Sequence, residues 1–373
     1  MNRNRVNKKR MGGARVLSRA AAGMLAAALC FQPMTALAGP AGDSSLTSSS
    51  SNAGPGGGSV SSNSGSTGSS GGSTSVSNGG VSAVTSGLGV YRVTENEGIG
   101  AIARGVDVSY WQQNVNWSQV ASDNVQFAML ATRFRGNVDP FFAMNAANAS
   151  QAGLRLGAYI YSYATSVEMA QQEADFVLNL IKDYPISFPV VFDAEDANTL
   201  GTLTQSQVSD VINAFCKRIQ DAGYYPMVYA NEYWIANKID MSKISYDIWV
   251  AKYQQKYTYS KTSMWQASNT GSVKGVNGNV DIDYLYKDYM QIIPGNTWRT
   301  IAGNRYYYQN HVMQKSAWIN DGQNWYYMNA AGNPSTGWLE LSGKKYYLEA
   351  DGHMITGWKT LDGGWRYFDA SGE

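Results

Sequence analysis

Residues 189–195 read PVVFDAE, a short apolar run that ends in two carboxylates spaced two positions apart. Residues two apart on a strand point to the same face, so Asp193 and Glu195 are expected side by side. The apolar residues before them predict a strand that leads the pair out of the core toward one mouth of a sheet or barrel. This strand therefore indicates both the fold and the place where chemistry is expected.

Strand and helix patterns alternate on both sides of this stretch, from residue 98 to residue 293. The predicted strands are 105–109, 126–132, 155–163, 189–193, 226–230, 247–251, 263–267 and 280–284, and the predicted helices are 141–152, 166–182 and 204–222. The last helix begins with Thr204 and Gln207, which are spaced as a capping box. The alternation predicts an α/β domain folded as a TIM-like β/α barrel with parallel strands. The barrel should be irregular, because the last three strands leave little room for helices.

Three of the predicted strands carry carboxylates at or near one end, where barrels of this kind hold their active sites. Asp107 lies in the first strand, and Asp281 with Asp283 lies in the last. Two carboxylates in a partly apolar cleft tend to have pKa values that are pushed apart, which gives one acid and one base or stabiliser. Such a pair can cleave a glycosidic bond. The alternative for Asp193 and Glu195 is a helix N-cap or an acidic surface turn.

Histidine and cysteine are too scarce for several other kinds of chemistry. His311 and His353 lie near the C-terminus, and Cys216 is the one cysteine between residues 39 and 310. Nucleophile systems built from Ser/His/Asp or Cys/His, and zinc sites rich in His or Cys, are therefore excluded from the central region. Cys216 falls on the apolar face of the helix 204–222 and is interpreted as a core residue. The histidines are expected in exposed turns.

Residues 1–38 have the features of a secretory signal peptide. Their seven charges are all basic, an apolar stretch follows, and Ala36-Leu37-Ala38 supplies the small residues of a cleavage site. A membrane anchor is the alternative, but Gln32-Pro33 interrupts the apolar stretch well short of the roughly 20 residues that span a bilayer. The rest of the chain carries 22 basic and 28 acidic residues, a net charge of −6. This balance disfavours nucleic acid as a partner, and no membrane contact is expected after cleavage.

The chain changes composition at both ends of the predicted barrel. Residues 39–97 consist mostly of Ser and Gly and predict a disordered linker. Residues 294–373 repeat with a period of 20, as the positions of Trp298, Trp318, Trp338 and Trp358 illustrate. Four units of this length, the last truncated, suit one β-hairpin each. Because a lone hairpin is marginally stable, we expect the hairpins to stack as a solenoid with aromatic side chains between neighbours.

Six blocks of the central region, in this order, resemble glycoside hydrolase family 25, the lysozymes also called N-acetylmuramidases. The resemblance spans residues 102 to 287, and no single block is specific, whereas six in order are. The blocks are GVDVSYWQ at 105–112, AGL at 152–154 leading to GAY at 157–159, FDAE at 192–195, WVAKY at 249–253, WQ at 265–266 and GNVD at 278–281.

The resemblance implies cleavage of the β-1,4 bond between N-acetylmuramic acid and N-acetylglucosamine in peptidoglycan, without metal or cofactor. Glu195 matches the general acid/base, and Asp193 matches a partner that supports the attacking 2-acetamido group of the substrate or attacks directly. Asp107 and Asp281 match the remaining acidic positions, and Asp283 is the less favoured of its pair. Five aromatic side chains are candidates for stacking on the sugars, with a place in the core as the alternative for each: Tyr161, Tyr163, Tyr229, Trp249 and Trp265.

The repeats resemble the cell-wall-binding, or choline-binding, repeats of Gram-positive surface proteins. In that family aromatic side chains and often a Met form a cage that holds a quaternary ammonium by cation–π attraction. The matching positions are Trp318, Trp325, Tyr327, Trp338, Tyr347, Met354, Trp358 and Tyr367. Arg305, Lys345 and Arg366 interrupt the Trp-Tyr-Tyr block elsewhere, which favours a neutral or anionic wall glycan over choline. The alternative is that the aromatic residues are only the stacking core of the solenoid.

Together these features predict a secreted, cell-wall-associated peptidoglycan hydrolase whose aromatic repeats bind a wall glycan or a choline-decorated polymer. Two other functions remain open at this point. One is a wall-binding protein with a catalytically silent barrel, and the other is an extracellular glucan-binding protein. The carboxylates at positions 107, 193, 195 and 281 argue against the silent barrel.

Overall fold

The structure is a computed structural model that describes residues 75–78, 81–86, 89–93 and 98–373. The predicted signal peptide lies outside the described residues, as does most of the predicted linker. Within that linker, however, β1 (Ser75–Asn78), β2 (Val81–Ser86) and β3 (Gly89–Val93) form an antiparallel three-stranded sheet. The prediction of a linker without structure is wrong for this stretch. Its signals are the Gly-Gly step at 79–80 and the Val and Thr residues on either side of it, which favour a hairpin.

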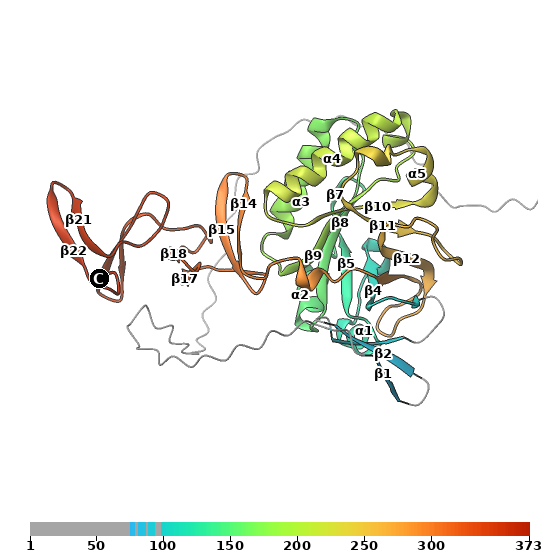
Figure 1. Ribbon diagram of the computed structural model, residues 1–373, viewed down its shortest axis with the longest axis horizontal. Helices are drawn as coiled ribbons and strands as arrows, with labels where there is room; N and C mark the ends of the chain where they lie inside the picture. The colour runs from blue at the N-terminus through green and yellow to red at the C-terminus, as the bar shows by residue number, and fades with distance from the viewer. Residues whose placement is uncertain (1–74, 79–80, 87–88, 94–97) are drawn as a thin grey trace, which may run out of the picture. The chain divides into compact units, whose positions relative to one another are not determined.

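Eight strands close into a barrel in the order β10-β11-β12-β13-β4-β5-β8-β9 (Figure 1). Their bounds are β4 Ala103–Val108, β5 Phe127–Ala131, β8 Arg155–Tyr161, β9 Ile186–Asp193, β10 Pro226–Asn231, β11 Asp247–Ala251, β12 Thr262–Gly271 and β13 Val280–Leu285. All eight predicted strands are confirmed. Strand β13 pairs antiparallel with both neighbours, β12 and β4, while the other pairs are parallel. The barrel is irregular at the predicted place, but one strand runs in the opposite direction.

The three predicted helices are also confirmed, as α2, α3 and α4. Thr204 caps α4 in the predicted capping box with Gln207, and Ser166 caps α3. The helices are α1 Trp117–Ser122, α2 Phe142–Gln151, α3 Val167–Ile181, α4 Gln205–Asp221 and α5 Glu232–Asn237. The shorter elements are η2 Tyr110–Gln112, β6 Arg133–Phe134, β7 Asn137–Val138, η3 Leu200–Thr202, η4 Met241–Lys243 and η5 Tyr289–Gln291. Among the described residues, no helix is both long and apolar enough to cross a membrane.

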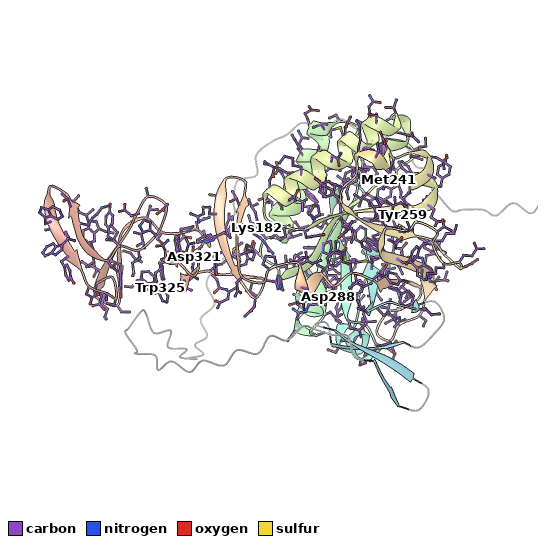
Figure 2. All side chains as sticks on the ribbon, viewed as in Figure 1. Lys182, Met241, Tyr259, Asp288, Asp321 and Trp325 are labelled. Atoms are coloured by element: carbon purple, nitrogen blue, oxygen red, sulfur yellow. The ribbon has the colours of Figure 1, made fainter. Side chains whose placement is uncertain are left out.

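Two apolar layers stabilise the barrel, and side chains fill its interior (Figure 2). One layer lies inside the strands and includes Phe127, Met129 and Trp249. The other lies between the strands and the helices, and Cys216 is fully buried in it, as predicted. Gly105 makes room for the inner layer, since a Cβ at that position would lie 2.2 Å from the ring of Phe127. The interior is therefore a packed core, and only its mouth is available for chemistry.

The repeat region forms four hairpins, as its period predicts. The first combines β14 (Thr297–Ile301), β15 (Asn304–Gln309) and β16 (Val312–Met313), the second β17 (Ala317–Asn320) and β18 (Trp325–Met328), the third β19 (Gly337–Leu341) and β20 (Lys344–Leu348), and the fourth β21 (Gly357–Leu361) and β22 (Gly364–Phe368). Aromatic rings of neighbouring hairpins meet, with 4.9 Å between the centroids of Trp318 and Tyr346. The predicted stacking of aromatic side chains between units is confirmed.

The first hairpin packs into the outer layer of the barrel, although the sequence period places it with the repeats. Tyr308 donates a hydrogen bond of 2.8 Å to the carbonyl of Lys182, and Arg299 lies between the rings of Tyr224 and Tyr308, 3.9 and 4.3 Å from their centroids. His311 is buried in the same hairpin, and burial together with the charges of Arg299 and Arg155 lowers the pKa of its imidazole to about 4. The expectation of an exposed turn is wrong for His311, because the hairpin packs against the barrel.

Candidate active site

Glu195 is held where β9 ends and the following loop begins. Its Oε1 atom accepts a hydrogen bond from the backbone N–H of Asn231, at the end of the neighbouring strand β10. The side chain of Asn231 caps α5 by accepting from the N–H of Trp234, at 3.1 Å. Asn231 is thus fixed by the start of a helix, and through it the carboxylate of Glu195 is oriented toward the strand ends.

Asp193 lies in the last position of β9, and its side chain is buried. Its Oδ1 atom has no hydrogen-bond partner among the described residues. A buried carboxylate oxygen without a donor costs free energy, and such atoms are found where a substrate or a catalytic role explains them. The predicted side-by-side placement of Asp193 and Glu195 agrees with the electrostatics, since the charge of Glu195 is among the causes that raise the pKa of Asp193.

Asp107 and Asp281 are direct partners across the β4–β13 pair. Asp107 stands near the carboxyl end of β4, whereas Asp281 stands near the amino end of β13. The reversed direction of β13 brings this amino end to the mouth formed by the carboxyl ends of the parallel strands. Asp281 therefore joins the site from a strand that a fully parallel barrel would have placed the other way round.

A buried hydrogen-bond network connects the mouth to the layer beneath it. Gln266 of β12 donates to Oδ2 of Asp107 at 2.7 Å and accepts, at 2.8 Å each, from the hydroxyls of Tyr229 and Tyr253. Below, Trp249 donates to Oδ1 of Asp283 at 3.0 Å. Asp283 is fully buried, which agrees with its lower ranking as a cleft residue. The sequence reasoning missed Gln266 and Tyr253, although both lie in blocks that carry the family resemblance.

Burial raises the pKa of Asp107, Asp193, Glu195 and Asp281, the four predicted catalytic carboxyl groups. The pKa of Asp281 rises to about 6 because of burial, and that of Glu195 rises for the same reason, opposed by the hydrogen bonds from Asn231. Burial and then the charges of neighbouring carboxylates raise the pKa of Asp107 well above its usual value. Burial and the charges of Glu195 and Asp196 do the same for the pKa of Asp193. Acids that stay protonated near neutral pH can donate protons, so the mouth is suited to acid catalysis.

Two of the predicted sugar-stacking aromatic residues are core residues. Trp249 is 1% exposed inside the barrel, and Trp265 is 2% exposed on the outer side of β12, where it donates to the carbonyl of Lys252. No sugar ring can stack on either, so the prediction is wrong for both. Tyr229 is also buried, and its hydroxyl is engaged by Gln266. Its role is to orient the network, not to form a wall of the cleft.

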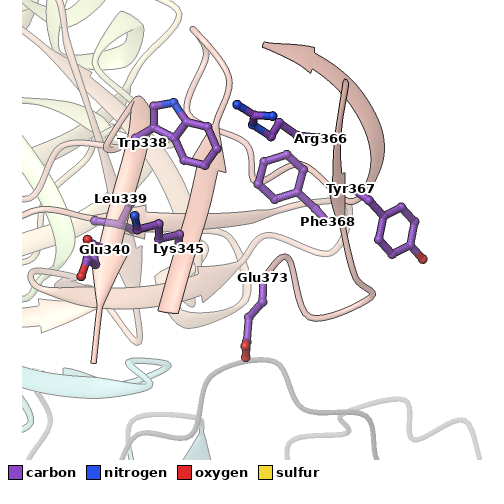
Figure 3. A pocket seen from close by; sticks show the side chains of 8 residues that line it. All are labelled: Trp338, Leu339, Glu340, Lys345, Arg366, Tyr367, Phe368 and Glu373. Carbon is purple, nitrogen blue, oxygen red and sulfur yellow. The ribbon is translucent and has the colours of Figure 1, made fainter. Parts of the chain in front are cut away.

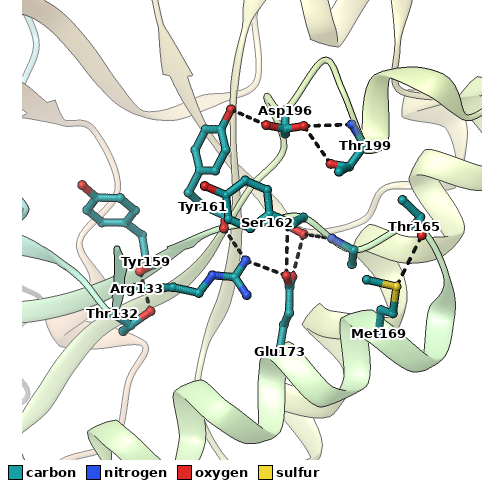
Figure 4. Close-up of polar contacts among 12 residues, drawn as sticks. Thr132, Arg133, Tyr159, Tyr161, Ser162, Thr165, Met169, Glu173, Asp196 and Thr199 are labelled. Atoms are coloured by element: carbon teal, nitrogen blue, oxygen red, sulfur yellow. Dashed lines mark hydrogen bonds and ion pairs between the residues drawn. The ribbon is translucent and has the colours of Figure 1, made fainter. Parts of the chain in front are cut away.

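Tyr161 ends β8 and Tyr163 follows it, and both are half-buried. Figure 4 shows the polar contacts around Tyr161. Glu173 of α3 accepts from the side chains of Arg133 and Ser162 and from the N–H of Tyr163. The hydroxyl of Tyr161 donates to Asp196 at 3.1 Å. Both tyrosines thus remain candidates for the walls of the cleft.

An exposed aromatic group stands next to the mouth and was not among the predicted site residues. Trp111, in η2 directly after β4, is 68% exposed and meets the ring of Phe134 edge to face, with 5.7 Å between centroids. Tyr110 stacks on Phe134 at 4.0 Å, and its N–H donates to Asp139 at 2.6 Å. The signal that could have found Trp111 is its place three residues beyond the end of the strand that carries Asp107.

The repeat residues predicted to bind a wall ligand lie at two junctions between hairpins, the second and the third, and in the fourth hairpin. Trp318 and Tyr327 lie 5.4 Å apart, and Trp325 packs with buried Met354 at the second junction. Trp338 and Tyr347, 5.3 Å apart, belong to the third junction. Trp358 and Tyr367, 5.2 Å apart, lie in the fourth hairpin, and both are largely exposed.

Among the described residues, no group of three or more His, Cys, Asp and Glu side chains is arranged to hold a metal ion.

Residues 106–276 match the family model of glycosyl hydrolases family 25, residues 316–333 match a putative cell wall binding repeat and residues 335–373 match a choline-binding repeat. The uncharacterized protein YegX of Escherichia coli (strain K12) is 31% identical over 189 residues, which cover 48% of this chain and 68% of that protein. The chain belongs to glycosyl hydrolases family 25.

Two further proteins are similar to this member of family 25. Lysozyme M1 of Streptomyces globisporus is 30% identical over 195 residues, 48% of this chain and 66% of that protein. The crystal structure of the CTP1L endolysin is 26% identical, with a TM-score of 0.45 over 51% of this chain and 69% of that one. As a family 25 hydrolase with wall-binding repeats, the chain is a glycosidase that acts on peptidoglycan and associates with the cell wall.

Proposed function

We propose that the protein is a secreted N-acetylmuramidase, which hydrolyses the β-1,4 bond between N-acetylmuramic acid and N-acetylglucosamine while its repeats hold it on the wall. The observation that carries this proposal is the meeting of carboxylates from three separate parts of the barrel at one mouth. Asp193 ends β9 and Glu195 follows it, Asp107 lies near the carboxyl end of β4, and Asp281 arrives from the reversed strand β13. Four acidic side chains, placed where burial raises their pKa values, suit protonation of a glycosidic oxygen.

Glu195 is the proposed general acid and then the general base. Burial raises the pKa of its carboxyl group, which favours the protonated form that can donate to the leaving oxygen. The N–H of Asn231 binds Oε1 and stabilises the carboxylate that remains after the proton is transferred. Both contacts therefore support a group that gives up a proton and takes one back.

Asp193 is the proposed partner that supports the 2-acetamido group of the substrate. Its unpartnered Oδ1 atom is free to accept a hydrogen bond from an amide N–H, which would orient the acetamido oxygen for attack on the anomeric carbon. Asp107, fixed by Gln266, and Asp281 tune the charge around this step. Export is proposed from the features of residues 1–38, which resemble a signal peptide.

The bond that is cleaved can be read from the fragments released from purified peptidoglycan. We expect soluble fragments with a reducing-end muramic acid, measured by mass spectrometry after borohydride reduction. Fragments that end in a reducing glucosamine, or peptides freed from the glycan, would contradict the proposal. The Glu195→Gln protein is the negative control. Asp221→Asn is the matched control, since Asp221 is the exposed last residue of α4, which leads into the amino end of β10, opposite the mouth.

A further inference from the structure

One cross-strand pair of residues occupies an equivalent position in successive hairpins, but the residue types differ from hairpin to hairpin. In each hairpin, one residue of the first strand faces one residue of the second, and together they meet the preceding hairpin. These pairs are Ile319 with Tyr326, Leu339 with Tyr346, and Lys359 with Arg366. The second and third hairpins thus present an aliphatic and an aromatic side chain, whereas the fourth presents two cations.

The two cations of the fourth hairpin change how the regularly spaced Trp residues pack against the following hairpin. Trp298 meets Tyr326, and Trp318 meets Tyr346, with 4.9 Å between centroids in each case. Trp338 has no tyrosine to meet at that position, because Arg366 stands there. In the fourth hairpin Trp338 instead meets the ring of Phe368, at 5.9 Å, and its indole N–H donates a hydrogen bond of 3.4 Å to Asp362, while the side chain stays 48% exposed. The third junction is therefore less closely packed than the two before it.

A pocket of 720 Å³ lies at this junction (Figure 3). It is lined by Trp338, Leu339, Glu340, Lys345, Arg366, Tyr367, Phe368 and Glu373. Figure 3 shows the guanidinium of Arg366 pointing back across the pocket toward the ring of Trp338. A pocket of this size, with an exposed indole at one side, can admit a sugar ring.

The charged groups of the pocket differ in whether they already have partners. Glu373 is ion-paired with Lys344, and Lys359 with Glu349. Lys345 and Arg366 have no ion-pair partner among the described residues. Glu340, opposite Lys345 across the hairpin, has no ion-pair partner among them either. In total, the lining contains two cations, Lys345 and Arg366, and two carboxylates, Glu340 and Glu373. An anion is therefore attracted by the two unpaired cations and not by an overall positive charge.

At the first junction, between the first and second hairpins, a cation of the chain itself covers the Trp ring. Arg305 takes the strand position that Lys345 takes two repeats later, and its guanidinium lies 4.1 Å from the ring centroid of Trp298. The chain's own cation thus covers that Trp. In the third junction, no such cation–π contact between Trp338 and a cation is present in the described structure, and the ring stays open to a ligand.

We propose that the pocket between the third and fourth hairpins binds an acidic glycan, with a sugar ring stacked on Trp338 and a phosphate or carboxylate group between Lys345 and Arg366. The two cations oppose a quaternary ammonium, so this junction does not act as a choline site. The inference rests on the proposed wall-holding role of the repeats, but it is independent of the catalytic step.

The test uses the full chain and isothermal titration calorimetry with four probes. Poly(glycerol phosphate) offers a phosphodiester, polyglucuronic acid a carboxylate, dextran a neutral sugar and choline chloride a quaternary ammonium. We expect binding to at least one acidic polymer, and the one that binds identifies the source of the anion. Arg366→Tyr should weaken this binding about tenfold or more, the effect of losing one charge-assisted hydrogen bond. Tyrosine occupies this position in the three preceding hairpins, so the variant is expected to fold.

Lys315→Ala is the matched control, because Lys315 lies outside the pocket in an ion pair with Asp183. It should change the affinity by less than about twofold. Equal binding of the acidic polymer by wild-type and Arg366→Tyr proteins, or tighter binding of choline than of either acidic polymer, overturns the inference. If the wild-type protein binds neither the acidic polymers nor isolated walls, this result contradicts the proposed wall-holding role of the repeats. Wall binding that survives Arg366→Tyr unchanged contradicts only the assignment of this pocket.

Discussion

The barrel mouth and the repeats treat charge in opposite ways. At the mouth and in the layer beneath it, Asp193 and Asp283 are buried, and each has one carboxylate oxygen without a hydrogen-bond partner among the described residues. In the second to fourth hairpins, the carboxylates are exposed or half-buried, and some of them form ion pairs, such as Glu373 with Lys344 and Glu349 with Lys359. A closed barrel with a large core can tolerate the cost of desolvated acids, whereas a stack of hairpins with small cores cannot. The barrel mouth is therefore suited to acid chemistry, whereas the repeats offer exposed rings and charges for the proposed binding to the wall.

The largest expected effect separates these two roles completely. Glu195→Gln removes the proposed proton donor but keeps an oxygen that can accept from Asn231, so the fold should persist. We expect turnover of peptidoglycan to fall about 10²- to 10⁴-fold, the usual contribution of general acid–base catalysis. Sedimentation with purified walls should remain at the wild-type level. A variant that retains wild-type turnover would remove Glu195 from the mechanism.

The next effect concerns where the barrel ends and the repeats begin. A chain that stops at residue 315 keeps the first hairpin, whereas one that stops at residue 295 loses Arg299, Tyr308 and their contacts with Tyr224. Each fully buried apolar side chain contributes about 1.5–3 kcal/mol, so the shorter chain should lose several kcal/mol of unfolding free energy. Urea unfolding of the two truncated proteins measures this. Equal unfolding free energies of the two truncated proteins would mean that the first hairpin does not stabilise the barrel.

The buried acids of the mouth also predict how stability depends on pH. Burial raises the pKa of Asp281 to about 6 and that of Asp283 well above its usual value, while both ionise near pH 3.9 in the unfolded chain. Between these values the folded state holds more protons, so the unfolding free energy should fall as pH rises from about 4 to about 6 and beyond. The loss is about 1 kcal/mol per pH unit for each such group.

Asp283→Asn provides the matched test, because asparagine keeps an acceptor for Trp249 and cannot ionise. Its unfolding free energy, measured in urea between pH 4 and pH 8, should fall less steeply than that of the wild-type protein. Profiles with the same slope would mean that Asp283 does not remain protonated in the folded state.

The smallest expected effect is on sugar binding next to the mouth. Trp111→Ala removes an exposed ring and should raise the KM for long glycan strands about 2- to 10-fold, with little change in kcat. Trp265→Phe is the control, since Trp265 is buried on the outer side of β12. It should lower the melting temperature and leave KM unchanged. The opposite pattern would restore Trp265 as a contact of the substrate and exclude Trp111.

Periodicity was sufficient to predict the eight strands, three helices and four hairpins, because apolar spacing reports which residues are buried. It could not predict that β13 runs in reverse, since a strand has the same alternation in either direction. The two misplaced tryptophans have different explanations. Trp265 could have been placed correctly, because Gln266 faces the interior and its neighbour must face outward. Trp249 does face the interior, but the depth to which the barrel is filled depends on side chains from every strand.

Among the catalytic candidates, the spacing of Asp193 and Glu195 was informative because one strand carries both. The meeting of Asp107 with Asp281 depends on pairing between residues 174 positions apart, and no local pattern reports it. The sheet at residues 75–93 was missed for another reason. Its small residues suggested a linker by composition, while the hairpin signal lay in the order of those residues.

The reversal of β13 also affects how such a protein can be assembled from modules. Leu285, the last residue of β13, pairs with Ala103, the first residue of β4, so the chain leaves the barrel at the end opposite the carboxylates. In a barrel of eight parallel strands, the last strand would release the chain beside the catalytic mouth. Here, a tail of any length can be added, exchanged or lost without passing in front of the substrate. Because of this one reversed strand, the repeat region can change without affecting access of the substrate to the barrel mouth.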